Sequence, residues 1–514
     1  MYLKVTDYKE NTRRIAKNTL MLYVRMLFMM LLGLFTSRIV LEALGECDYG
    51  IYNVVGGVVS MFTIISGALT TAVTRFITFE MGKGMEAKLE KVYSTAVTVQ
   101  FLIALIVVVL AEPIGLWFID NKMTIPVDRI PVARTVLHFS LLAFAVNLMS
   151  VPQMASITAH EQMSVYAYVG ILEGILRFVV AIIISRASYD RLPLYAALMA
   201  AVMIIVRMSY GIYCRSHFTE CRYRFLFDKG LIRDMFSFAG WNFLGVSSGV
   251  LRDQGGNILV NLFSGPAVNA ARAVAFQLNG AVQNFVTNFM TAVNPQITKS
   301  YASGDHEYMH SLLRKSSRMS FYLLFVLSLP VILNVDFVLS LWLKEVPAHA
   351  SGFVQLFMIY ALSESVSHPL VTAIMATGKI KNYQIVIGGL IFLNLPVSYA
   401  FLKTGCPPEV TVAVSIVISQ LCLAARLLML RRMIGLSVRD FLSRIYFNVL
   451  RVAAAGAAVA WLPVCLLPSG FVYSCLSLVL TFLAAVLSCL FLGCSSEERA
   501  YLFSMTAGWF RRRG

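Results

Sequence analysis

A succession of long apolar segments fills almost the whole of this chain and limits what it can fold into. A helix needs about 20 mostly apolar residues to cross the hydrocarbon of a bilayer, and the connections between these segments are too short to be soluble domains. Hydrophobic residues make up 58% of the 514 residues, more than a soluble protein needs. We therefore expect an all-α polytopic membrane protein with about fourteen transmembrane helices, at 19–42, 50–78, 92–117, 133–156, 163–185, 192–214, 235–263, 267–295, 318–343, 353–376, 381–402, 409–430, 446–467 and 471–494.

The basic residues of the loops predict the orientation of these helices. With the N-terminus in the cytoplasm, the opposite side carries only a few of the 43 lysines and arginines, namely Lys122, Arg129, Arg186, Arg191, Lys344 and Lys403. The excess of lysine and arginine on the cytoplasmic side follows the positive-inside rule, so both termini are expected in the cytoplasm. Because the net charge of +16 is spread over many loops as a topology signal, we expect no nucleic acid partner.

The sequence lacks the motifs of covalent chemistry. It has no phosphate-binding G-x-x-x-x-G-K-[ST] loop, no histidine and cysteine cluster with metal-ligand spacing, and no G-x-S-x-G nucleophile elbow. The longest external loop, 118–131, offers no paired acid and base that could serve a membrane glycan polymerase or ligase. We therefore expect a protein that is not an enzyme, with no catalytic residue, no metal ligand and no cofactor, and that moves a substrate instead.

A repeat runs through the membrane segments. Residues 44–84 recur 220 positions later, with matches at Gly45/Gly265, Thr71/Thr291, Ile77/Ile297 and Gly84/Gly304. A second set follows at an offset of 217: Pro152/Pro369, Ile157/Ile374, Ala159/Ala376 and Tyr166/Tyr383. Two related halves are typical of transporters that rock one bundle against the other around a midplane site. Chance similarity between apolar helices is the alternative, which the agreement of two blocks disfavours.

Apart from the first residues of the spans, ten arginines and no lysine lie inside the predicted spans. A charge at the bilayer centre costs at least ~2.5 kcal/mol, so such residues tend to face a wet cavity or an acidic partner. Glu173 and Arg177, four residues apart on one helix, can neutralise each other. Four others lie near span ends, where the side chain can extend to the headgroups: Arg38, Arg75, Arg134 and Arg426.

The arginines of the seventh and eighth spans suit a cavity. Arg252 lies near the middle of 235–263 among four glycines, and broken helices line transport sites. Asp253 is displaced from it by about 100° round the helix, so the two do not face each other squarely. Arg272 begins a polar stripe on one face of the next span, followed by Asn279, Gln283, Thr287 and Asn294.

Such a stripe either lines water or joins helices by hydrogen bonds, and two arginines beside the amides favour a cavity. Arg25, about two turns into 19–42, is the best candidate from the first half. Unpaired arginines favour an anion, because a guanidinium binds phosphate oxygens in bidentate fashion and stays charged. An exporter of cationic drugs would need carboxylates, yet the first two spans contain no acid except Glu42 at a span end.

The chain resembles the Wzx-like polysaccharide flippases of O-antigen and capsule synthesis, in the multidrug/oligosaccharidyl-lipid/polysaccharide exporter superfamily. The resemblance covers the first twelve spans and is weakest over 446–514. Its motifs, weak singly, gain specificity from their order and spacing: SRIV at 37–40, LG at 44–45, YGIYN at 49–53, NIL at 257–259, GP at 265–266, NAAR at 269–272 and TAVNPQI at 291–297.

The resemblance implies two pseudo-symmetric six-helix lobes in a V plus two C-terminal helices, with the first, second, seventh and eighth helices lining a central cationic cavity. It implies a lipid-linked oligosaccharide, carried on undecaprenyl pyrophosphate, as the substrate. Relatives use proton or sodium gradients, so Asp253 is the candidate coupling carboxylate; its alternative role is to neutralise a neighbouring arginine. The corresponding domains are 1–229, 230–440 and 441–514.

We therefore expect a flippase of a bacterial inner membrane that works by alternating access. Arg25, Arg252 and Arg272 would bind the pyrophosphate or acidic sugars, and the stripe side chains Asn279, Gln283 and Thr287 would bind sugar hydroxyls. One chain is long enough for a complete pathway, so a monomer is expected to function, with glycan polymerase machinery as a further partner. The alternatives are a drug antiporter, a peptidoglycan-precursor flippase, a membrane glycan polymerase or ligase and, weakest, a structural scaffold.

Overall fold

The computed structural model describes residues 2–60, 63–84, 86–121, 126–224, 228–343, 346–468, 470–496 and 498–499. Within these ranges the regular structure is helical, without a strand, which confirms the all-α class. Some of the residues behind the predicted topology, Lys122, Lys344 and the C-terminal stretch 501–514, lie outside the described residues.

The chain divides into two compact units. Unit 1 contains Met1–Val246 and Thr291–Gly304, and unit 2 contains Ser247–Met290 and Asp305–Gly514. One long helix, α7 (Lys229–Ala302), contributes its two ends to unit 1 and its middle to unit 2. The proposed domain limits at 229 and 440 stay a prediction.

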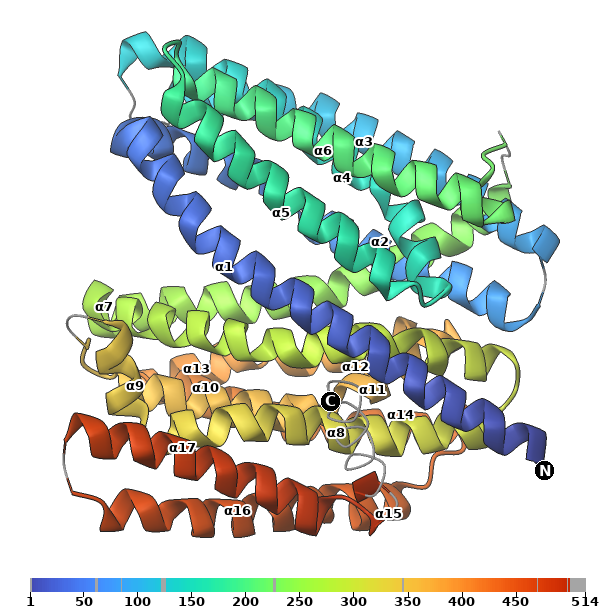
Figure 1. The fold of residues 1–514 in the computed structure, drawn as a ribbon, viewed down its shortest axis with the longest axis vertical. Coiled ribbons are helices and arrows are strands. Elements are labelled where there is room, and N and C mark those ends of the chain that lie inside the picture. The colour runs from blue at the N-terminus through green and yellow to red at the C-terminus, as the bar shows by residue number, and fades with distance from the viewer. Residues whose placement is uncertain are drawn as a thin grey trace, which may run out of the picture. The chain divides into compact units, whose positions relative to one another are not determined.

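Unit 1 is a helical bundle in which α1 packs mainly against α5, and α4 packs against α6, α3 and α2. Its centre is apolar, with Ile77, Leu137, Ile157 and Ile184 buried. Besides the ends of α7 its elements are α1 (Tyr2–Ser60), α2 (Thr63–Gly82), α3 (Glu86–Asn121), the 3₁₀ turn η1 (Val127–Arg129), α4 (Ile130–Ala159), α5 (Met163–Arg186), α6 (Arg191–His217) and the 3₁₀ turn η2 (Thr219–Cys221) (Figure 1).

Unit 2 is a second bundle in which α8 packs against α10, α17 and α16, and α14 packs against α10 and α12. Besides the middle of α7 its elements are α8 (His306–Leu333), α9 (Val335–Trp342), α10 (Ala350–Ser365), α11 (His368–Thr377), α12 (Lys381–Phe392), α13 (Asn394–Lys403), α14 (Val410–Ile434), α15 (Val438–Phe441), the π turn η3 (Leu442–Tyr446), α16 (Phe447–Leu466), α17 (Phe471–Ser488) and the π turn η4 (Cys489–Gly493).

The repeat is present in the backbone as well as in the sequence. Gly45 has φ 77° inside α1, and its match Gly265 has φ 82° inside α7, so each long helix changes direction at the same point of the repeat. Gly84 and its match Gly304 also have positive φ, 69° and 77°. Glycine adopts this left-handed conformation without the clash that a Cβ would cause. The loops that we predicted between the first and second and between the seventh and eighth spans are therefore glycine kinks.

Ten helices are long and apolar enough to cross a membrane, so the protein is a multi-pass membrane protein. This number refers only to the described part of the chain, and the predicted number of fourteen transmembrane helices is not confirmed. The ten are Arg14–Gly45, Lys88–Asn121, Val127–Ala159, Met163–Arg186, Arg191–His217, His306–Leu333, Lys381–Lys403, Val410–Ile434, Val438–Leu466 and Phe471–Gly493.

Four predicted spans are absent from these ten, for physical reasons that differ. The segments 235–263 and 267–295 are helical in α7 but carry the arginines and amides singled out above, which lower their hydropathy. The segment 353–376 is divided between α10 and α11, because Pro369 in the first turn of α11 disfavours helix before it. The segment 50–78 runs across residues 61–62, which are not described.

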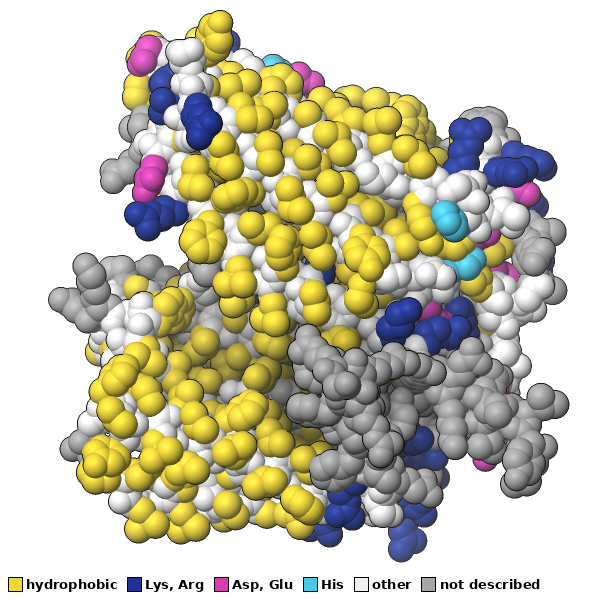
Figure 2. Space-filling view, viewed as in Figure 1, with side chains coloured by type: hydrophobic (Ala, Val, Ile, Leu, Met, Phe, Trp, Pro, Cys, Tyr) yellow, Lys and Arg dark blue, Asp and Glu magenta, His cyan; other side chains and the backbone are white. Residues whose placement is uncertain are grey.

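The outer faces of the bundles are apolar. Figure 2 shows hydrophobic side chains covering α5 and α6 in unit 1 and α16 and α17 in unit 2, with lysine and arginine gathered mainly near helix ends. Large apolar side chains such as Ile183, Ile212, Leu462 and Val479 are exposed on these helices. A soluble protein rarely exposes such continuous apolar surface, so these faces suit contact with lipid.

Candidate functional site: arginines of helix α7

The middle of α7 carries the arginines that we singled out, Arg252 before the kink and Arg272 after it, both in unit 2. Arg252 Nε donates a hydrogen bond to Asp253 Oδ1 at 2.9 Å. Its Nη1 donates to the Tyr360 hydroxyl of α10, and its Cζ lies 5.1 Å from the centroid of that ring. The guanidinium is thus held by an acid on its own helix and an aromatic ring on another.

The pairing of Arg252 with Asp253 corrects our expectation from helix geometry. Adjacent residues point about 100° apart, yet the salt bridge forms. The long arginine stem bends the guanidinium round the helix, where the short aspartate meets it. Sequence spacing describes where Cβ atoms point and is a poor guide to the tip of a side chain with four rotatable bonds.

Arg272 is more deeply buried, with 4% of the residue exposed. It donates a hydrogen bond to Asn257 Oδ1 across the kink, and its Cζ lies 5.5 Å from the Phe357 ring centroid. Its Nε is buried and has no hydrogen-bond partner among the described residues. A Cβ built on Gly256 would lie 2.7 Å from Arg272 Nη2, so this glycine makes room for the guanidinium.

Another buried ion pair joins α14 to α10 in the same unit. Arg426 Nη1 lies 3.4 Å from Glu364 Oε1, and only 4% of Arg426 is exposed. Our expectation that Arg426 extends to the headgroups was therefore wrong, because an acid one helix away holds it inside the bundle. Glu364 is the only acid in the predicted span 353–376, a signal that our reading of the sequence did not use.

The polar stripe continues from Arg272 along α7. Asn279 is buried, and its Oδ1 has no hydrogen-bond partner among the described residues. Gln283 is half-buried, and the exposed Thr287 donates its hydroxyl to the Gln283 carbonyl at 3.1 Å. Asn294, the last residue of the stripe, belongs to the part of α7 in unit 1. Unit 2 therefore places the half-buried Arg252 and the buried Arg272 on one helix with two amides of the stripe, and one carboxylate, Asp253, pairs with Arg252.

Arg25 lies in unit 1, where it packs against α5. Its Cζ lies 4.4 Å from the Tyr166 ring centroid, and its Nε is buried without a hydrogen-bond partner in the described part of the chain. A Cβ on Gly170 would overlap the Arg25 side chain. The residue is thus a half-buried cation over an aromatic ring, an arrangement worth about 0.5–2 kcal/mol.

Four other arginines of unit 1 have local partners. Arg177 binds Glu173 through Nε and Nη2, at 3.0 and 2.6 Å, which confirms the predicted pair. The Arg38 side chain is 80% exposed and pairs with Glu42. Arg134 pairs with Asp120 at 2.9 Å. Arg75 differs from our expectation, because its guanidinium lies over the rings of Phe76 and Phe79 and the residue is half-buried.

No group of three or more His, Cys, Asp or Glu side chains that could hold a metal ion occurs in the described part of the chain. The chemistry on offer in unit 2 is instead that of cationic hydrogen-bond donors beside neutral amides. A guanidinium binds carboxylate or phosphate oxygens in bidentate fashion. The excess of arginine over acid on α7 suits an anionic group.

Comparison with known proteins agrees with this architecture. The family model described as "Polysaccharide biosynthesis protein" matches residues 15–301. A crystal structure of MATE in complex with MaD3S has a TM-score of 0.72 at 10% identity, over 82% of this chain and 97% of that one. MATE transporter ClbM in complex with Rb⁺ has a TM-score of 0.67 at 14% identity, over 83% and 96%.

A third similar structure is a MOP superfamily transporter from Pyrococcus furiosus, for which reverse polarity of the binding pocket suggests a different function. Its TM-score is 0.69 at 10% identity, over 82% of this chain and 96% of that one. No curated protein matches the chain. At these identities the solved structures show the fold alone, which this chain shares with those transporters.

Proposed function

Because this chain belongs to the polysaccharide biosynthesis protein family, we propose that it is a flippase for a lipid-linked oligosaccharide. The substrate would be carried on undecaprenyl pyrophosphate and cross a bacterial inner membrane for surface polysaccharide synthesis. The observation that supports an anionic headgroup is the pair of arginines on α7, with a single acid beside them. Alternating access would release the headgroup on the outer side while the lipid stays in the bilayer.

The site residues divide into two roles in this proposal. Arg252 and Arg272 bind the pyrophosphate or acidic sugars, with Arg272 offering a buried Nε–H that no described residue accepts. Arg25 contributes the same chemistry from unit 1. The stripe side chains then bind sugar hydroxyls, since amides both donate and accept: Asn279, Gln283 and Thr287.

Asp253 is the candidate for coupling to a proton or sodium gradient. Its carboxylate competes with an anionic substrate for Arg252, because it already holds Nε at 2.9 Å. A proton or a sodium ion on Asp253 would free the guanidinium for the headgroup. The alternative is that the aspartate only neutralises the arginine. Asp253→Asn separates the two: a coupling role predicts export that no longer responds to the ion gradient, and a neutralising role predicts gradient-dependent export.

The test is made in the native bacterium. Deleting the gene should trap full-length lipid-linked repeat units on the inner leaflet and abolish surface polymer. Arg252→Ala should fail to restore export although it inserts, and Arg252→Lys should restore it poorly, because lysine keeps the charge and loses the bidentate fork. Arg38→Ala, which removes an exposed arginine, is the matched control and should restore export. Normal export by Arg252→Ala would contradict the assignment.

A drug antiporter is the second candidate, favoured by the fold shared with MATE transporters. In that case the deletion leaves surface glycan normal and changes drug sensitivity. Accumulation of a peptidoglycan precursor in the deletion strain would instead identify the chain as a peptidoglycan-precursor flippase. Single repeat units that reach the outer face without polymerising would point to a glycan polymerase or ligase. We propose a monomer with both termini in the cytoplasm, working beside glycan polymerase machinery.

A further inference from the structure

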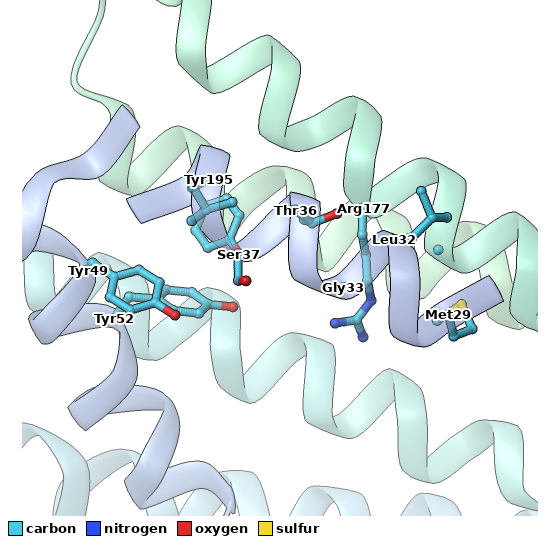
Figure 3. Close-up of a pocket in the computed structure, with 11 residues that line it drawn as sticks. Met29, Leu32, Gly33, Thr36, Ser37, Tyr49, Tyr52, Arg177 and Tyr195 are labelled. Atoms are coloured by element: carbon cyan, nitrogen blue, oxygen red, sulfur yellow. The ribbon is translucent and has the colours of Figure 1, made fainter. Parts of the chain in front are cut away.

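Unit 1 contains a cavity of about 220 Å³ between α1, α5 and α6. Figure 3 shows that polar side chains from all three helices surround it, among them Ser37 of α1, Arg177 of α5 and Tyr195 of α6. Pockets that bind small molecules are mostly apolar with a few placed polar groups. This one is lined by an arginine, several hydroxyls and aromatic rings inside a membrane bundle.

Two glycines create this cavity where α1 packs on α5. A Cβ on Gly174 would lie 2.5 Å from Met29 Sδ, so this glycine lets the two helices approach closely. A Cβ on Gly33 would meet no atom within 4 Å, so the missing side chain leaves the space open. The cavity therefore depends on Gly33, a position where a larger side chain would fit without disturbing the backbone.

The positive charge of Arg177 in the cavity is already neutralised by Glu173. Glu173 Oε1 accepts hydrogen bonds from Arg177 Nε and Nη2 at 3.0 and 2.6 Å. A guanidinium has five N–H donors, so the pair fixes its orientation and leaves donors for a ligand. Because the Glu173–Arg177 pair has no net charge, it attracts an anion less strongly than Arg252 and Arg272, which have only one acid, Asp253, beside them. A neutral ligand with many hydroxyl groups suits it better.

The tyrosines provide the other half of a saccharide site. The rings of Tyr52 and Tyr195 meet edge to face with centroids 4.7 Å apart, and both line the cavity with Tyr49. An aromatic ring presents an apolar face to the C–H face of a sugar, and its hydroxyl makes hydrogen bonds at the rim. Thr36 and Ser37 add hydroxyls from α1.

We propose that this cavity, in unit 1, binds a neutral sugar unit of the transported glycan, separately from the arginines that bind the charged headgroup. This rests on the proposed function, which supplies the glycan, and adds a saccharide subsite to it. The Glu173–Arg177 pair would bind sugar hydroxyls while the tyrosines cover the ring.

The test measures binding of two probes to the purified full chain in lipid nanodiscs. One probe is the lipid-linked oligosaccharide extracted from the deletion strain, and the other is undecaprenyl pyrophosphate without sugar. Gly33→Leu fills the cavity and should weaken binding of the first at least tenfold without changing the second. Gly211→Leu, at an equally open glycine of α6 outside the cavity, is the control and should change neither.

A double variant, Glu173→Gln with Arg177→Met, removes the pair without leaving one buried charge alone. It should reproduce the loss for the oligosaccharide if Gly33→Leu does not fold. Unchanged oligosaccharide binding in a folded variant overturns the subsite and leaves the proposed function intact. Equal loss for both probes also overturns it, because the cavity would then serve the pyrophosphate. If the unsubstituted protein binds neither probe, the proposed function itself fails.

Discussion

Glu161 in unit 1 and Gly378 in unit 2 occupy the same position of the repeat, and the two units use it differently. Both residues have positive φ, 60° and 74°, so both turns need the left-handed conformation. In unit 2 glycine ends α11 without steric cost. In unit 1 a glutamate adopts this conformation at a cost of about 1–2 kcal/mol. The contacts of its carboxylate must offset that strain.

The Glu161 carboxylate has a side-chain exposure of 0% and three partners. It accepts from Gln296 Nε2 at 2.6 Å and pairs with Lys299 at 2.7 Å and Arg14 at 2.8 Å. The Glu161 carbonyl accepts from Asn18 Nδ2 at 2.9 Å. The turn between α4 and α5 therefore joins the start of α1 to the end of α7 inside unit 1.

The two units thus share their glycine geometry and differ in the placement of charge. Unit 1 has a fully paired acid at the end of its helices, whereas unit 2 has an excess of arginine in the middle of α7. A repeat preserves the backbone, because kinks and turns depend on glycine at fixed positions. It leaves the polar side chains free to serve structure in one half and binding in the other.

The largest effect should come from Glu161→Gln. Removing one member of a buried ionic network leaves its partners without compensation, which costs about 3–5 kcal/mol. Thermal unfolding of the purified protein in detergent measures it. Glu161→Gly should be less destabilised than Glu161→Ala by about 1 kcal/mol, because glycine relieves the positive φ. Equal stability of Glu161→Gln and the unsubstituted protein would show that the network does not hold unit 1 together.

A smaller effect is expected at Gly256 in unit 2. In Gly256→Ala the new Cβ would lie 2.7 Å from Arg272 Nη2, so the guanidinium must move. Binding of undecaprenyl pyrophosphate should weaken about tenfold, equivalent to about 1.4 kcal/mol, with little change in thermal unfolding. Gly249→Ala, on the same helix with open space around it, is the control. Similar binding by both variants would argue against a role of Arg272.

The smallest effects should be equal in the two units. Gly45→Ala and Gly265→Ala place a Cβ in open space, so only the positive φ is penalised, by about 1 kcal/mol each. Gly50→Ala, an open glycine with helical φ in α1, should be neutral or stabilising. Thermal unfolding of the three variants measures both signs. Unequal losses of stability in Gly45→Ala and Gly265→Ala would show that the two kinks do not contribute equally to the stability of their units.

The sequence by itself determined the class of this protein, its repeat and the place of its unusual charges. Hydropathy over a span depends only on the residues of that span, and a left-handed kink depends on one glycine. Both can therefore be predicted from the local sequence. The arginines of α7 were found for the same reason, because a charge inside an apolar run stands out wherever the helix later packs.

Only the tertiary structure decided which charges are paired. Arg426 is held by Glu364 on another helix, and Glu161 binds partners more than 130 residues away in the chain. Even the neighbours Arg252 and Asp253 meet through the bend of a long side chain, which helical spacing does not describe. Pairing depends on where distant helices bring side-chain tips together, and periodicity along one helix contains no information about the other helix.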